Sequence, residues 1–183
     1  MNDNIRQLTH SDISDTVKLF QTSFQHDHIY DEYGLDVNQK LQAFTDCIVY
    51  AIDYGQSFGV YQNNKLISFL LGFDYHKGFQ ENPAAMATVF GLDEQGVSLY
   101  KELSAFFEEA KKHANLYYIM SIATQQAYRQ KGFASLLIDH LIRSTSMDIM
   151  GDVSSMISMP MYYKRGFSAN PLGDNYNMVI LTR

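Results

Sequence analysis

The sequence predicts an α+β or mixed α/β fold, in which helices cover both faces of one sheet. Apolar residues recur at helical spacing in some segments and form continuous, strand-length runs in others, and the two kinds of segment alternate irregularly along the chain. The length of 183 residues fits one domain, 1–183, and 46% hydrophobic against 19% charged residues is the balance of a globular protein. We therefore expect a single domain with one core.

The first half of the chain predicts a strand, two helices and a β-hairpin. The segments are a strand at 5–8, a helix whose apolar face begins at Ile13, a second helix at 37–54, and strands at 57–62 and 66–75. Asn63 and Asn64 join the two hairpin strands, and asparagine tolerates the positive φ angles of a tight turn. An acidic, aromatic loop at 26–34 connects the two helices.

The second half predicts a helix-bearing insertion, followed by a strand, a loop and a helix. Residues 76–96 show no clear periodicity, but apolar residues then recur at helical spacing from Leu99 to Ala114. Tyr117–Ala123 is a nearly continuous apolar run, which is typical of a strand covered on both faces. The remaining expected elements are a helix at 132–142, a strand within 147–153, a short helix at 158–164 and a final strand at 177–181.

The loop between this strand and helix, Gln126–Ala134, has the chemistry to hold a diphosphate. The first turn of a helix offers unpaired N–H groups and the positive end of the helix dipole. Gly132 lacks a Cβ, so phosphate oxygens can approach the backbone closely, while Arg129 and Lys131 add positive charge. The alternative is an ordinary helix start with a turn glycine and solvated basic residues.

A second motif downstream connects this loop to a known family. Arg129, Gly132 and Ala134 fit the pattern (Arg/Gln)-x-x-Gly-x-(Gly/Ala), and Tyr162, Gly166 and Phe167 fit the pattern Tyr-x-x-x-Gly-Phe. With the strand before the loop, the order and spacing of both motifs resemble those of the GNAT superfamily of acyl-CoA-dependent N-acyltransferases. The resemblance implies a GNAT fold with a central, mixed but mostly antiparallel sheet of six to seven strands, and it places the helix-bearing insertion between strands 3 and 4.

The resemblance also implies the ligand and the residues that bind it. The co-substrate is acetyl-CoA, the acceptor is a primary amine, and no metal takes part. The backbone of the strand would bind pantetheine and polarise the thioester carbonyl, and the loop would bind the pyrophosphate; the implied contacts are Ile122, Ala123, Thr124, Arg129, Gln130, Lys131, Gly132, Phe133 and Ala134. Ser155 stands where the family often has asparagine. Tyr162 would protonate the leaving thiolate, with neighbouring Tyr163 as the alternative.

The general base stays unassigned, because the strand Tyr117–Ala123 contains no Asp or Glu. Asp74, His76 and Glu32 are the alternatives on neighbouring loops. In the family, the loop between the first two helices lines the acceptor side, so a cationic amine would meet an acidic set here; its members are Tyr30, Asp31, Glu32 and Tyr33. A solvated acidic loop is the equally weighted alternative.

Charge, cysteine and histidine content limit the classes of ligand and the kinds of site that the sequence predicts. With 20 acidic and 14 basic residues the net charge is −6, which opposes binding to nucleic acid and to anionic membranes. The single Cys47 lies in an apolar helical stripe, where a buried thiol is favoured over a catalytic one. His26 and His28 alternate in one loop without further metal ligands nearby. We expect a cytoplasmic location, and a homodimer is left open.

Two other classes of function remain as alternatives. The same fold could bind acyl-CoA without turnover, as a sensor or assembly module, although the presence of Tyr162 beside the intact loop favours an enzyme. A nucleotide-binding protein could use the loop for ATP, but the loop lacks the Gly-Lys-Ser/Thr ending that positions magnesium. The sequence does not identify the acceptor, the physiological acyl group or the oligomeric state.

Overall fold

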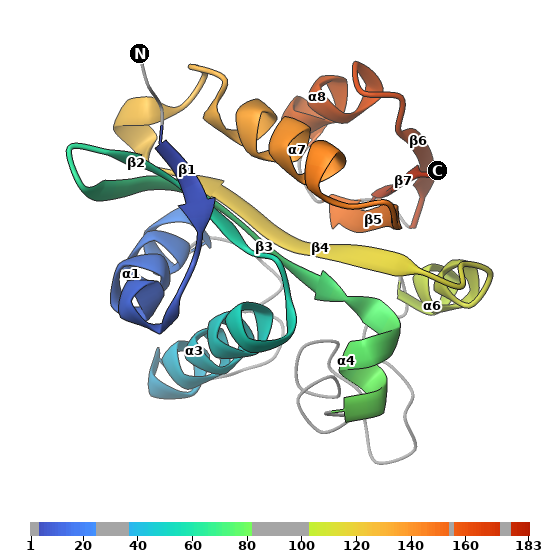
Figure 1. The fold of residues 1–183 in the computed structure, drawn as a ribbon, viewed down its shortest axis with the longest axis horizontal. Helices are drawn as coiled ribbons and strands as arrows, with labels where there is room; N and C mark the ends of the chain where they lie inside the picture. Colours follow the sequence, from blue (N-terminus) through green and yellow to red (C-terminus); the bar gives the residue numbers. More distant parts are fainter. Residues whose placement is uncertain (1–3, 25–36, 82–102, 154–155, 173–176) are drawn as a thin grey trace. The chain divides into compact units, whose positions relative to one another are not determined.

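The structure is a computed structural model, and it describes residues 4–24, 37–81, 103–153, 156–172 and 177–183. Seven strands of these residues form one sheet in the order β1-β2-β3-β4-β5-β7-β6 (Figure 1). The chain divides into two compact units, which we describe separately. The first unit comprises residues 1–72 and 121–140, and the second comprises 73–120 and 141–183.

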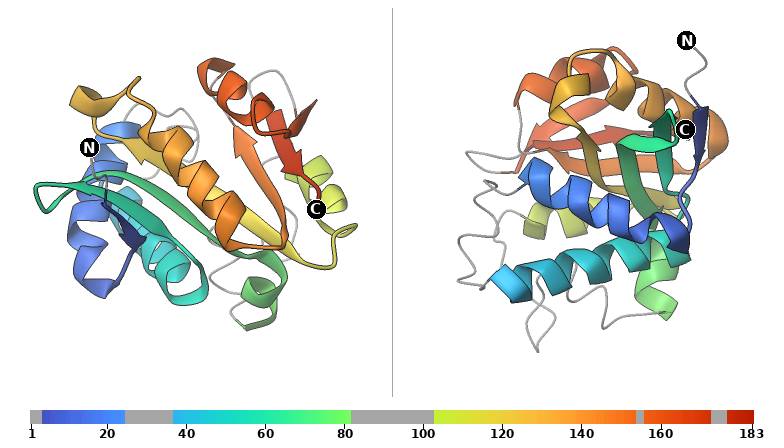
Figure 2. Two further views of the ribbon diagram at one scale, coloured as in Figure 1. Left: turned by 45° about the horizontal axis from the view of Figure 1, so that its top comes forward. Right: turned by 90° about the vertical axis from the view of Figure 1, so that its left-hand side faces the viewer.

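The first unit is built on an antiparallel sheet. Its elements are β1 (Asn4–Gln7), the 3₁₀ turn η1 (His10–Asp12), α1 (Ile13–Phe24), α3 (Val37–Tyr54), β2 (Phe58–Gln62), most of β3 (Lys65–Asp74), the end of β4 (Leu116–Thr124), the 3₁₀ turn η2 (Gln126–Tyr128) and most of α7 (Phe133–Ser144). β2 pairs antiparallel with both β1 and β3. Figures 1 and 2 show α1 and α3 side by side on one face of these strands and α7 on the other. The predicted covering of both faces by helices is confirmed.

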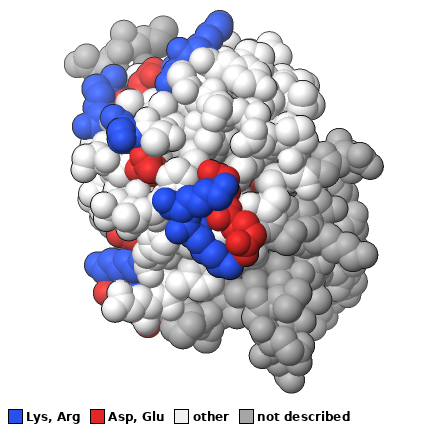
Figure 3. All heavy atoms as spheres, turned by 90° about the vertical axis from the view of Figure 1, so that its right-hand side faces the viewer, with Lys and Arg blue, Asp and Glu red and all other residues white. Residues whose placement is uncertain are grey.

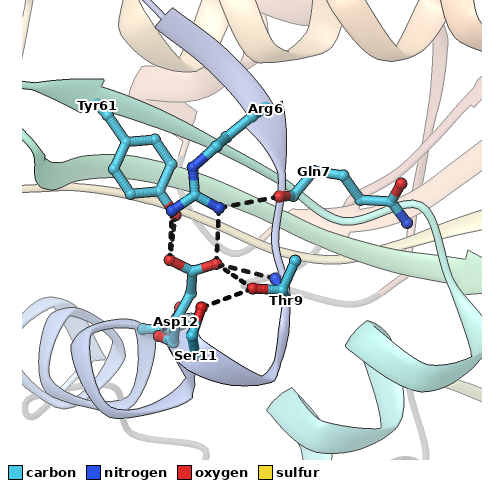
Figure 4. A network of polar contacts seen from close by, with 7 residues as sticks. Arg6, Gln7, Thr9, Ser11, Asp12 and Tyr61 are labelled. Atoms are coloured by element: carbon cyan, nitrogen blue, oxygen red, sulfur yellow. Dashed lines mark hydrogen bonds and ion pairs between the residues drawn. The ribbon is translucent and has the colours of Figure 1, made fainter.

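The start of α1 is fixed to the sheet by a polar network (Figure 4). Both guanidinium NH groups of Arg6 on β1 donate to the carboxylate of Asp12, at 2.8 and 2.6 Å. The hydroxyl of Tyr61 on β2 donates to the same carboxylate at 2.8 Å, and the backbone N–H of Thr9 donates to it at 2.9 Å. The hydroxyl of Thr9 also donates to it at 2.9 Å. Asp12 is only 7% exposed, so five donors compensate the burial of its charge.

The β-hairpin of the first unit confirms the sequence-based prediction. Asn63 and Asn64 form its turn with φ angles of 51° and 60°, in the left-handed region that asparagine tolerates. β3 is buried at every position from Leu66 to Phe73, as expected for a central strand. Ser57, which is 1% exposed, ties the hairpin to α3 by donating from its hydroxyl to the carbonyl of Ala51 at 2.9 Å.

The second unit combines a parallel strand pair with a C-terminal antiparallel ladder. Its elements are α4 (Tyr75–Glu81), α6 (Leu103–Ala110), the start of β4, β5 (Asp148–Val153), the 3₁₀ turn η3 (Met156–Ser158), α8 (Met159–Tyr163), β6 (Ser168–Pro171) and β7 (Asn177–Leu181). β4 pairs parallel with β5 from Leu116 to Ile119. β7 then pairs antiparallel with both β5 and β6. The sheet is therefore mixed and mostly antiparallel, as predicted.

Two elements of this unit were not predicted. α4 spans only seven residues, which is too short to show a helical period in the sequence. It also contains a buried glycine, Gly78. Its first turn is capped by Asp74, whose carboxylate accepts from the backbone N–H of Lys77 at 3.0 Å. β6 is polar and ends in Pro171. This composition suits a strand at the edge of the sheet with a single partner, but in the sequence it is typical of a loop.

The predicted insertion helix is found in part. α6 covers the middle of the predicted range 99–114, and 99–102 lie outside the described residues. Its residue Phe106 is fully buried and packs edge-on against Tyr118, with ring centroids 5.3 Å apart. Just after α6, Lys111 and Lys112 each bond a glutamate three residues earlier at 2.6 Å. The face in Figure 3 accordingly shows basic and acidic side chains next to one another.

Among the described residues, no helix combines the length and the apolar character that spanning a membrane requires.

Candidate active site

The end of β4 is held in place by β3, in the first unit. The hydroxyl of Ser68 donates to the carbonyl of Ala123 at 2.8 Å and lies 2.8 Å from the hydroxyl of Thr124. Gln125 follows, and its backbone N–H bonds the carbonyl of Ile67 at 2.9 Å. Its side-chain amide bonds the carbonyl of Leu66 at 2.6 Å. These four contacts fix the strand end at which the sequence predicts pantetheine binding.

The loop after β4 folds back on itself before α7 begins. Gln130 and Gly132 both have left-handed φ angles, of 61° and 88°. The Nε of Arg129 donates to the carbonyl of Thr124 at 3.2 Å, and the ammonium of Lys131 donates to the carbonyl of Ala127 at 2.9 Å. Both basic side chains are exposed and donate to backbone carbonyls within eight residues of the chain, so their positive charge stays in this segment.

Gly132 leaves open space where α7 starts. A Cβ built on this residue would have no heavy atom within 4 Å. The N–H of Leu136 donates to the carbonyl of Gly132 at 2.9 Å. The N–H groups that precede Leu136 in α7, starting at Phe133, have no acceptor within the helix. Phe133 is 7% exposed and packs against Tyr128, which anchors the turn. Unpaired donors, the helix dipole and nearby positive charge fit a pyrophosphate.

One buried polar atom of β4 escaped the sequence analysis. The hydroxyl of Ser121 is shielded from solvent and has no hydrogen-bond partner among the described residues. Burying a hydroxyl without a partner costs about 1–3 kcal/mol. Ser121 directly precedes the backbone groups of Ile122–Thr124, so a polar ligand bound along this strand end could supply the missing partner. A lone serine in an apolar run gave no signal in the sequence.

Tyr162 lies in the second unit, on α8. It is 5% exposed, and its ring packs edge-on against Phe167 with centroids 5.3 Å apart. Gly166 has φ +84°, and this turn lets the N–H of Phe167 bond the carbonyl of Tyr162 at 3.3 Å. The Tyr-x-x-x-Gly-Phe motif is thus a local structure that fixes the tyrosine ring. Tyr163, by contrast, is 54% exposed.

The environment of Tyr162 keeps its hydroxyl protonated. Burial raises the pKa of this phenol well above its usual value, and the negative charge of Asp152 raises it further. Among the described residues, no side chain hydrogen-bonds the Tyr162 hydroxyl. At neutral pH the phenol is therefore in the protonated form that a general acid requires.

Some of the other site residues predicted from the sequence lie outside the described part of the chain, and others make structural contacts. Ser155 and the acidic set Tyr30, Asp31, Glu32 and Tyr33 lie outside the described residues, as do His26 and His28. Asp74 caps α4, and His76 Nε2 lies 2.6 Å from the carbonyl of His113, so both alternatives for the base have structural contacts. Burial raises the pKa of the Cys47 thiol to about 12, which makes it a poor nucleophile.

The described residues contain no group of three His, Cys, Asp or Glu placed to bind a metal ion. They do contain a tyrosine–carboxylate pair that the sequence did not reveal. The hydroxyl of Tyr118 on β4 donates to the carboxylate of Asp152 on β5 at 2.6 Å. The two residues are 34 positions apart, so only the parallel pairing of their strands brings them together.

Each unit thus contains one of the two motifs that the sequence analysis singled out, the loop before α7 in the first unit and the tyrosine turn after α8 in the second. The model of the acetyltransferase (GNAT) family matches residues 15–167, so the chain belongs to this family. The chain is accordingly an acetyl-CoA-dependent N-acetyltransferase. The match runs across both compact units.

Solved structures show the same fold. An agmatine N-acetyltransferase in its apo form has a TM-score of 0.73 at 10% identity, covering 99% of each chain. The polyamine N-acetyltransferase of Drosophila melanogaster, which forms N-acetylagmatine, has a TM-score of 0.68 at 10% identity over 100% of each chain. PaiA N-acetyltransferase of Thermoplasma acidophilum in complex with coenzyme A has a TM-score of 0.59 at 11% identity over 100% of each chain. No curated protein sequence matches the chain.

Proposed function

We propose that this enzyme transfers the acetyl group of acetyl-CoA to a primary amine by direct attack, using residues 1–183 as one acetyltransferase domain. The observation that carries the proposal is the open start of α7, where Gly132 has no neighbour in the space of a Cβ. Backbone donors of the first helical turn converge there with the positive charge of Arg129 and Lys131. Acetyl-CoA would be held by its pyrophosphate at this point.

The reactive end of acetyl-CoA would then lie along β4. Backbone N–H groups of Ile122–Thr124 lie beyond the stretch of β4 that pairs with β5, and they are the proposed partners of pantetheine and the thioester carbonyl. The contacts of Ser68 and Gln125 hold this strand end rigidly, so little reorganisation is needed when the ligand binds. Ser155 would contribute a further polar contact, and Tyr162 would protonate the thiolate as the C–S bond breaks.

The proposed acceptor is a cationic alkylamine. Two structural neighbours act on agmatine or polyamines, and the net charge of −6 favours positively charged substrates. The loop set Tyr30, Asp31, Glu32 and Tyr33 would attract such an amine. An alkylammonium with a pKa of about 10.4 must lose a proton before it attacks, at a cost of about 4 kcal/mol at pH 7.4. The enzyme therefore needs a proton acceptor on the acceptor side.

The test is a panel of primary amines assayed with acetyl-CoA, with release of the CoA thiol as the readout. The panel would contain agmatine, linear polyamines, arylalkylamines and peptides with a free α-amino group. We expect turnover with cationic alkylamines and little thiol release when amine is omitted. Tight binding of acetyl-CoA without turnover of any amine would instead indicate an acyl-CoA-binding module.

A further inference from the structure

The second unit has a half-buried carboxylate on the strand next to β4. β4 itself, Leu116–Thr124, contains no Asp or Glu, but Asp152 lies on β5, the neighbour of β4 in the sheet. Asp152 is half-buried, and Tyr118 donates to its carboxylate at 2.6 Å. This short hydrogen bond fixes the position of the Asp152 carboxylate.

Tyr118 is itself rigidly held. Its side chain is 5% exposed, and its ring packs edge-on against Phe73 at 5.4 Å and against Phe106 at 5.3 Å. Both phenylalanines are fully buried. The ring therefore has little freedom to turn, and its hydroxyl points to a fixed place. Tyr118 orients the carboxylate of Asp152 without having to react.

Asp152 also lies within electrostatic reach of Tyr162. Its negative charge is the second cause, after burial, of the raised pKa of the Tyr162 phenol. All three residues belong to the unit formed by 73–120 and 141–183, so their arrangement is internal to that unit. A carboxylate and a protonated phenol within electrostatic reach of each other are the two kinds of group, base and acid, that amine acylation needs.

We propose that Asp152 accepts the proton of the acceptor amine and that Tyr118 is its positioning residue. This inference rests on the acetyl transfer proposed above. The ammonium gives one proton to Asp152, directly or through a water molecule, and the neutral nitrogen attacks the thioester carbon. As the C–S bond breaks, the thiolate takes the proton of Tyr162. The amide nitrogen loses its second proton through water to the Tyr162 phenolate, and Asp152 releases its proton to solvent, which restores the enzyme.

The experiment compares amines that differ only in pKa. The best acceptor of the panel is assayed beside its analogue with fluorine next to the amino carbon, because fluorine lowers the pKa of the amine. Asp152→Asn should lower kcat/KM for the parent amine by about 100-fold to 10,000-fold, and by clearly less for the fluorinated one. Calorimetry should show unchanged affinity for acetyl-CoA. Asp148→Asn on the same strand is the control, since its carboxylate bonds His113 and the backbone N–H of Arg183; it should keep the wild-type response to amine pKa.

Tyr118→Phe tests the positioning role separately. The variant keeps the ring that packs on Phe73 and Phe106 but lacks the hydroxyl that bonds Asp152. Loss of one hydrogen bond to a charged group should lower kcat/KM by about 10-fold to 100-fold, again more for the parent amine than for the fluorinated one. Should Asp152→Asn fail to fold, this variant decides the question by the same readout.

The outcomes separate the two proposals. Equal losses for both amines, or no loss, would overturn the role of Asp152 while leaving the acetyl transfer intact. If the wild-type enzyme binds acetyl-CoA but none of the amines tested causes release of the CoA thiol, the proposed function fails. The role of Asp152 then fails with it. A selective loss with the higher-pKa amine supports both.

Discussion

The hydroxyl of Ser68 on β3 bonds the carbonyl of Ala123 on β4 across a distance of 2.8 Å. Ser68 is fully buried, so the contact is shielded from water and persists as part of the core. It orients the strand end on which we place the thioester of acetyl-CoA. A side chain of the neighbouring strand thereby controls the direction of the backbone donors at Ile122–Thr124.

Ser68→Ala should weaken acetyl-CoA binding as well as stability. Loss of the buried hydroxyl should lower the free energy of unfolding by about 1–3 kcal/mol, because the Ala123 carbonyl loses its donor. The freed strand end should also raise the Kd for acetyl-CoA, measured by calorimetry. Ser57→Ala is the matched control: Ser57 is equally buried and bonds Ala51, so it should lower stability without changing the Kd. Equal effects on the Kd would contradict the role of Ser68.

Substitutions at Gly132 should separate backbone strain from loss of the ligand site. Gly132 has φ +88°, so any L-residue there is strained by about 1–2 kcal/mol, although a Cβ meets no neighbour. Gly132→Ala and Gly132→Glu therefore share the strain. Only the glutamate places bulk and negative charge where the pyrophosphate would bind. We expect both to fold and Gly132→Glu alone to abolish acetyl-CoA binding. Calorimetry that shows the same affinity in both variants would rule out this loop as the site.

The sequence predicted the fold where each element carries its own signal. The Asn63-Asn64 turn and the continuous apolar run of β4 are local patterns, and both were confirmed within one or two residues. The two motifs also mark local structures: a left-handed Gly132 before a helix, and a left-handed Gly166 that lets Phe167 return to Tyr162. Such features depend on neighbours in sequence, and a pattern can therefore reveal them.

Features that depend on distant residues gave no such signal. The contact of Tyr118 with Asp152 spans 34 residues, and that of Ser68 with Ala123 spans 55. Each arises only because two strands pair in one register. α4 was missed for a different reason, since seven residues span too few turns to show a period. β4 carries no carboxylate, whereas the neighbouring strand β5 offers Asp152.

Stability in acid should depend on Asp12. Hydrogen bonds from Arg6, followed by those from Thr9 and Tyr61, hold the pKa of Asp12 well below its usual range despite burial. The lowered pKa means that Asp12 stabilises the fold fully above the unfolded value of about 3.9, and that this contribution is lost as the pH falls further. Asp12→Asn should lower the free energy of unfolding by about 1–3 kcal/mol at pH 7. Urea titrations should show the difference from wild type shrinking between about pH 4 and pH 2.

A control for this effect is Asp53→Asn. A carboxylate oxygen of Asp53 lies 2.7 Å from Nε2 of His10, but the Asp53 side chain is 38% exposed. An exposed pair contributes about 0–1 kcal/mol, so this variant should differ little from wild type at pH 7. A deficit of Asp12→Asn that stays constant from pH 7 to pH 2 would mean that the charge of Asp12 is not what stabilises the start of α1.

Tyr162→Phe should impair the chemical step and leave acetyl-CoA binding intact. The hydroxyl is proposed to act only when the thiolate leaves, so kcat should fall by about 10-fold to 1000-fold with little change in the Kd for acetyl-CoA. The ring stays in place because it packs on Phe167, and the fold should therefore tolerate the change. Burial and the charge of Asp152 raise the pKa of the phenol, so wild-type kcat should show no loss through ionisation of this group near neutral pH.

Tyr163→Phe is the matched control for Tyr162→Phe. The two tyrosines are adjacent on α8, but Tyr163 is 54% exposed and Tyr162 is 5% exposed. Removing an exposed hydroxyl should change neither kcat nor the Kd. A further readout separates an acid from a structural residue, and it uses acetyl thioesters whose thiol has a lower pKa than that of CoA. Their thiolate leaves without needing a proton, so these donors should recover much of the rate in Tyr162→Phe. If Tyr163→Phe shows the loss instead, or if the better leaving group restores nothing, Tyr162 is not the acid.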